Sequence, residues 1–229
     1  MGRESTGGFS LIELMIVIAV IVVVAAIAIP SLLRSEMGAN ETSAIATLKA
    51  LVTAQNQFRL ARIVDQDTDG RGEYGLLQEL AGDEIPRGGT VALGSGAFIT
   101  SSLGVTSNGR PSRSGYLFQM YLPTGSSGAL RETDGAASPN SNYADFQESA
   151  WTCYAWPERA GYSGTKVFIV NEQGQVMGSN NEGSSQSYGG TSYPRANAAY
   201  VSGTRGIIGE LAGPNDDASD GGKWAPVGQ

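Results

Sequence analysis

The chain has 229 residues, a formal net charge of −7 and no histidine, and this length allows one membrane anchor and one modest globular domain. The acidic balance argues against a nucleic-acid partner, because phosphate backbones are bound by clusters of lysine and arginine and no such patch is present. The absence of histidine excludes a Ser-His-Asp triad, and the single cysteine, Cys153, excludes a disulfide within the chain.

A short polar segment, residues 1–8, precedes a long apolar run. The segment ends in Gly7-Gly8, the run begins at Phe9, and no charged residue occurs from Leu14 to Ile29. In a secretory signal peptide the small residues of the cleavage site follow the apolar stretch, whereas here they precede it. Cleavage after Gly8 would therefore remove the polar leader and keep the apolar segment.

Gly8, Phe9, Glu13 and Pro30 stand in an arrangement that resembles the prepilin leader of type IV pilins and of type II secretion pseudopilins. The resemblance covers Met1 to about Arg34, and the rest of the chain is similar to that family only in organisation. It implies that a prepilin peptidase cuts between Gly8 and Phe9 and methylates the new amine of Phe9. It also implies that Glu13 neutralises this amine during assembly, within one subunit or between neighbours.

A single long helix is predicted from about Phe9 to about Val64. Its first part, residues 9–34, is apolar almost all round and is predicted to be the transmembrane and polymerisation helix. At ~1.5 Å per residue, the run from Phe9 to Ile29 spans roughly 30 Å, about one hydrocarbon core. Glu13 is costly there and requires a partner. Pro30 is expected to kink or locally melt the helix, because it lacks a backbone donor.

The second part of the helix, residues 35–64, is amphipathic. Apolar residues recur at helical spacing while polar residues occupy the other faces, which predicts that one face packs against a sheet. The apolar residues are Ile45, Leu48, Leu51, Val52 and Phe58.

The end of this helix carries alternating carboxylates. Asp65, Asp67, Asp69 and Glu73, with Gly70 at the sixth place, match the first part of a calcium loop. The complete pattern requires a glutamate at the twelfth place, which is Leu76 here. The sequence therefore leaves two interpretations open: a calcium site, or a solvated acidic turn that ends the helix.

Residues 65–212 are predicted to form a globular β-rich head, and residues 213–229 an acidic, mobile tail. A short helical turn is expected at 76–80. Asn171 to Gly174 is expected to turn into residues 175–177 as a hairpin, and Pro123 to end a strand. Cys153 is expected to be a buried free thiol. Strands are predicted at 90–93, 116–122, 151–156 and 166–170.

The predicted fold class is α+β, with a long N-terminal helix packed on a small antiparallel sheet. The resemblance implies a structural subunit of a type IV pilus-like filament that polymerises with copies of itself. The further partners that it implies are the prepilin peptidase, an inner-membrane assembly platform and its ATPase. The precursor would cross the inner membrane once with its head in the periplasm, and the product would be a cell-surface or periplasmic filament.

Two other functions remain open at this stage. A pseudopilin of type II secretion keeps the family but changes the machine. A membrane-anchored binding or enzymatic head that never polymerises is the third interpretation, against which the absence of histidine and of a site motif counts. No enzymatic activity and no specific nucleic-acid site are expected, and calcium is the one cofactor considered.

Overall fold

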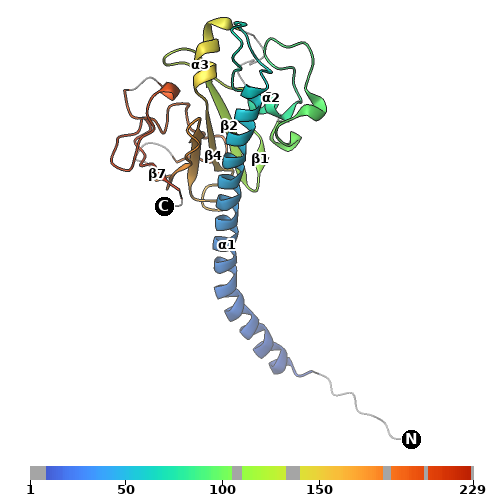
Figure 1. Cartoon of the computed structure of the whole chain (residues 1–229). Coiled ribbons are helices and arrows are strands. Elements are labelled where there is room, and N and C mark those ends of the chain that lie inside the picture. Colours follow the sequence, from blue (N-terminus) through green and yellow to red (C-terminus); the bar gives the residue numbers. More distant parts are fainter. Residues whose placement is uncertain (1–8, 105–109, 133–139, 183–186, 204–205, 228–229) are drawn as a thin grey trace, which may run out of the picture.

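The computed structural model describes residues 9–104, 110–132, 140–182, 187–203 and 206–227. A long helix, α1, extends from the head, and its upper half lies against an antiparallel sheet (Figure 1). Loops of the C-terminal third, coloured orange to red in Figure 1, lie on the other side of the sheet from α1. The α+β prediction is confirmed, with the long helix packed on the sheet as expected.

Helix α1 spans Leu11–Leu60 and contains 50 residues, so it is about 75 Å long at 1.5 Å per residue. It is continuous through Pro30, and its exposed half curves away from the line of the packed half (Figure 1). The alternative of local melting at Pro30 is therefore wrong. One missing donor at an exposed position is compatible with a bent but unbroken helix.

The packed half of α1 buries one face, as its sequence predicts. Leu48 and Leu51 are 0% and 1% exposed and join the cluster between helix and sheet, while Ile45 and Val52 are half-buried at its margin. Phe58 departs from the prediction that it covers the sheet. It packs instead among Ala54, Val64 and Leu80 and makes an edge contact with Phe98, with ring centroids 5.6 Å apart.

Polar contacts fix the head along the helix. The Asn40 side-chain amide donates to the Ser163 carbonyl at 3.0 Å. The Glu41 carboxylate accepts the Thr165 N–H at 3.0 Å and the Lys166 N–H at 3.3 Å. These bonds hold the lower rim of the head against α1, and Leu48 and Leu51 hold its centre. The orientation of the head on α1 is therefore fixed by contacts at several positions along the helix.

The sheet is antiparallel, with strand order β1-β2-β4-β5-β6-β7 and β3 paired to β2. The predicted strands at 116–122, 151–156 and 166–170 correspond to β2, β4 and β5, and the hairpin lies between β5 and β6. The short helices are α2 (Leu77–Ala81) and α3 (Ala144–Ser149). The strands are β1 (Ser112–Arg113), β2 (Tyr116–Pro123), β3 (Ala129–Leu130), β4 (Thr152–Pro157), β5 (Val167–Asn171), β6 (Met177–Ser179) and β7 (Ala225–Pro226).

The predicted strand at 90–93 is wrong. Val91 is 74% exposed, and the segment runs as irregular chain into a short 3-10 turn at Gly94–Gly96. It is flanked by glycines at 88, 89 and 94, and a short apolar run gains a strand conformation only when a partner strand pairs with it.

Both faces of the sheet are covered. One face packs on α1, and the other packs under a layer drawn from residues 188–224 that includes the buried Tyr188, Tyr200 and Trp224. The acidic tail therefore does not form a separate mobile segment over its described part: Trp224 is 0% exposed, and β7 pairs with β6. The head extends through residue 227. Cys153 is a buried free thiol in β4, as predicted.

Candidate functional site

The lower half of α1 is an apolar surface that the head leaves uncovered (Figure 1). From Phe9 to Glu36 every residue is exposed except Ala25, which is half-buried. Of the helices in the described part of the chain, α1 is the one that is long and apolar enough to cross a membrane, and nothing in its most apolar 18-residue window is buried. An apolar surface of this size is unfavourable in water, so lipid or other apolar helices must surround it.

Glu13 lies in the first turn of this surface. The Ser10 N–H donates to Glu13 Oε2 at 3.4 Å, which is half of the reciprocal capping arrangement of a Ser-x-x-Glu helix start. Phe9, immediately before, is 88% exposed, and Gly8 lies outside the described residues. In the uncleaved chain the Glu13 carboxylate thus supports the helix start, and it lies about one turn from the position where cleavage would create an amine.

The acidic segment after α1 brings together three of the predicted calcium ligands. One carboxylate oxygen from each of Asp65, Asp67 and Asp69 lies within 4.8 Å of the others. These carboxylates also accept N–H groups of their own loop: Gly70 donates to Asp65 at 3.2 Å, and Arg71 donates to Asp69 at 2.7 Å. The loop is therefore held by its own aspartates in the manner of Asx turns.

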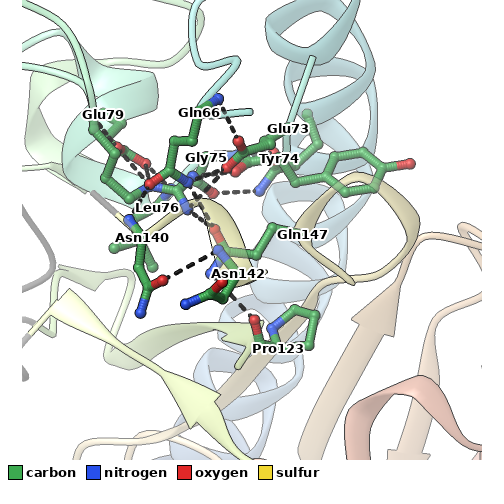
Figure 2. A network of polar contacts seen from close by, with 12 residues as sticks. Gln66, Glu73, Tyr74, Gly75, Leu76, Glu79, Pro123, Asn140, Asn142 and Gln147 are labelled. Atoms are coloured by element: carbon green, nitrogen blue, oxygen red, sulfur yellow. Dashed lines mark hydrogen bonds and ion pairs between the residues drawn. The ribbon is translucent and has the colours of Figure 1, made fainter. Parts of the chain in front are cut away.

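Glu73 does not join the aspartates. It is 1% exposed and turns into the head, where it accepts the Gln66 N–H at 2.8 Å and forms an ion pair with Arg87 at 3.5 Å. Figure 2 shows Glu73 within a network that also includes Gln147 of α3. The prediction that Glu73 is a ligand beside the aspartates is therefore wrong, because a buried arginine takes this carboxylate as its partner.

Arg87 is the centre of this buried network. Its guanidinium donates to Glu79 Oε1 at 2.9 Å and to Gln147 Oε1, and its charge is shared between Glu73 and Glu79. A buried charge is tolerated when it is paired and hydrogen-bonded. The network is saturated by its own members, so it joins α2, α3 and the loop after α1 as a structural element.

Two carboxylates that the sequence did not indicate lie next to the acidic loop. Oxygens of Asp145 and Glu148, both on α3, lie within 4.8 Å of each other and of an oxygen of Asp67. The only local signal is their spacing of three residues, which places them on one face of a helix. Their proximity to Asp67 results from tertiary packing and has no signature in the sequence.

Comparison with known proteins finds similar sequences for the N-terminal third of the chain. The model of the prokaryotic N-terminal methylation motif matches residues 5–29. The chain is 43% identical over 72 residues to the type IV major pilin protein PilA of Myxococcus xanthus. It is 45% identical over 53 residues to the type IV wide pilus major component PilA4 of Thermus thermophilus.

These matches cover 31% and 23% of this chain, and 32% and 40% of the two relatives. The chain thus matches less than half the length of either protein. No solved structure matches it. The N-terminal segment, which carries the methylation motif and the exposed apolar helix, is thus similar to that of type IV pilins.

Proposed function

We propose that this protein is the structural subunit of a type IV pilus-like filament. In this proposal a prepilin peptidase cleaves the precursor between Gly8 and Phe9 and methylates the new amine, and an inner-membrane platform with its ATPase adds the subunit to the filament. The observation that carries the proposal is the division of α1. One half is buried in the head, and the other half is apolar and uncovered from Phe9 to Glu36.

The physical chemistry of this helix suits a protein that exchanges one apolar environment for another. In the precursor, the exposed half would lie in the inner membrane with the head on the periplasmic side. In the filament, the same side chains would contact neighbouring helices, with close packing in place of lipid. Since apolar contacts carry little directional information, the specificity of assembly requires a polar pair.

Glu13 supplies one member of that pair. It is the single charged residue between Phe9 and Ile29, and a carboxylate at this depth is stable only with a partner. The amine created at Phe9 by cleavage is a cation at the same level, in the same subunit or in its neighbour. Pro30 would contribute the bend that lets the apolar half of α1 pack around a filament axis.

A pseudopilin of type II secretion is the alternative machine. Both curated relatives are components of pili, and this favours the pilus. The two functions separate in a deletion strain: loss of surface filaments with normal protein secretion supports the pilus, whereas loss of secretion with normal surface filaments supports the pseudopilus.

The role of Glu13 is tested by two substitutions in cells that contain no unmutated copy. Glu13→Gln removes the charge but keeps an oxygen that can accept the Ser10 N–H, because glutamine also serves at this capping position. Glu13→Asp keeps the charge. We expect sheared filament yield to fall by about tenfold or more with Gln, because the amine at Phe9 loses its charged partner, and to fall less with Asp.

Membrane insertion should remain normal in both variants, since Gln removes a charge from the apolar helix, which favours insertion, and Asp leaves the charge unchanged. Glu36→Gln, outside the apolar run, is the matched control and should leave filament yield unchanged. Full filament yield with Glu13→Gln would contradict the proposed pairing. A chain that inserts, is processed and never enters a filament would instead support the anchored, non-polymerising head.

A further inference from the structure

The acidic loop after α1 meets α3 at a cluster of carboxylates. Asp67 from the loop, and Asp145 and Glu148 from α3, each place one oxygen within 4.8 Å of the other two. Calcium binds oxygen ligands at about 2.3–2.6 Å, so two ligands on opposite sides of the ion lie about 5 Å apart. The three oxygens are therefore close enough to share one ion.

Glu148 distinguishes this group from an ordinary acidic surface. It is only 7% exposed, and its Oε1 is fully buried without a hydrogen-bond partner in the described structure. A buried carboxylate oxygen without a hydrogen-bond donor destabilises the folded state, because its lost hydration is not replaced by a protein contact.

The nearest arginines direct their contacts elsewhere. The Arg59 guanidinium donates to the main-chain carbonyl of Glu148 at 3.0 Å and lies over the ring of Tyr74 at 5.1 Å. Arg71 forms an exposed ion pair with Asp69 at 3.8 Å. The aspartates of the loop, by contrast with Glu148, accept backbone N–H groups. Even so, Asp65 Oδ1 on the loop and Glu148 Oε1 on α3 are both buried without a hydrogen-bond partner in the described structure.

We propose that Asp67, Asp145 and Glu148 bind a calcium ion that joins the loop after α1 to α3. A surface hollow of about 680 Å³, lined by Asp145 and Glu148 together with Arg59, Arg62 and Arg71, gives the ion and its water ligands access. Calcium is favoured over magnesium because its coordination tolerates irregular loop geometry, whereas magnesium requires a near-ideal octahedron. The ion lies at the far end of α1 from the polymerisation surface, so this inference does not depend on the proposed function.

The site is tested on the full-length protein in detergent by thermal unfolding with calcium and with chelator. Calcium sites of extracellular modules have Kd values of about 10⁻⁴–10⁻³ M, so about 10 mM calcium should raise the Tm by about 3 to 10 °C. Glu148→Gln should abolish this rise. Asp145→Asn, at an exposed position that does not threaten folding, should reduce or abolish it.

Glu172→Gln is the matched control, because Glu172 also has a buried carboxylate oxygen without a partner but belongs to neither carboxylate group found among the described residues. It should retain the calcium-dependent rise. Titration calorimetry should show one ion per chain in the wild type and none in Glu148→Gln. Identical melting of the wild type with calcium and with chelator, or a full rise in both Glu148→Gln and Asp145→Asn, would overturn the proposal.

Discussion

Gln55 and Gly75 exchange two hydrogen bonds in the interior of the head. Gln55 Nε2 donates to the Gly75 carbonyl at 2.7 Å, and the Gly75 N–H donates to Gln55 Oε1 at 2.9 Å. A side chain at position 75 does not fit, since a Cβ there would lie 2.5 Å from Leu80 Cδ1 and 2.9 Å from Phe58 Cε1. The pair thus ties the buried half of α1 to the chain that leads into α2, as a strand neighbour would.

Replacement of Gln55 by methionine should destabilise the head by about 2–4 kcal/mol. Methionine has a similar volume, but it leaves the Gly75 N–H and carbonyl buried without partners, and each unpaired group costs about 1–3 kcal/mol. Urea unfolding of the full-length protein in detergent measures the loss. Gln57→Met, on the exposed side of the same helix, is the control, and an equal loss in both variants would show that the Gly75 pair is not the cause.

The C-terminal layer should be essential to the fold. Trp224 is 0% exposed and contacts the ring of Tyr154 edge-on, with centroids 6.1 Å apart. Trp224→Ala should cost about 3–5 kcal/mol, because it leaves a large cavity over the sheet. The exposed neighbour variant Lys223→Ala should change stability by less than about 0.5 kcal/mol. A wild-type unfolding midpoint in Trp224→Ala would restore the view of residues 213–229 as a free tail.

Glu132 should lower the stability of the head as pH rises from about 4.5 to about 8. Burial raises the pKa of Glu132 to about 8 from its ordinary 4.5, so the folded chain keeps this proton while the unfolded chain releases it. Within that window the contribution of Glu132 to stability decreases by up to about 1.4 kcal/mol per pH unit, and the penalty is complete above pH 8.

Glu132→Gln removes this titration. The difference in unfolding free energy between pH 5 and pH 8 should therefore be smaller in Glu132→Gln than in the wild type. Glu210→Gln, at an exposed position, should keep the wild-type dependence. Parallel pH profiles for wild type and Glu132→Gln would show that the carboxylate is ionised in the folded protein throughout the range.

The parts of the fold that the sequence predicts are those encoded locally. The apolar run after Phe9, the stripe through Leu48 and Leu51, and the strands around Phe118, Cys153 and Ile169 follow from periodicity and composition. The layer that covers the face of the sheet opposite α1 could not be predicted, because Tyr188, Tyr200 and Trp224 are isolated among glycine, serine and asparagine. Their burial depends on where the loops cross the sheet, which is a tertiary outcome.

The same distinction applies to the candidate sites. Gly8, Phe9 and Glu13 belong to one short motif, so the similarity of this segment to pilin N-termini can be recognised from sequence. The loop aspartates were also visible, but the fate of Glu73 was not, because it depends on Arg87 folding over it. The proximity of Glu148 to Asp67 depends on α3 returning to the end of α1 across 81 positions of the chain, which is 148 minus 67.

In the proposed function this chain is processed after Gly8 and then forms a filament through α1. The most direct measurement is mass spectrometry of the N-terminal peptide of this chain from filaments sheared off the cell surface. This peptide should begin at Phe9 and carry one methyl group on its amine. A filament-borne chain that still begins at Met1, or a chain that is absent from filaments while abundant in the membrane, would contradict it.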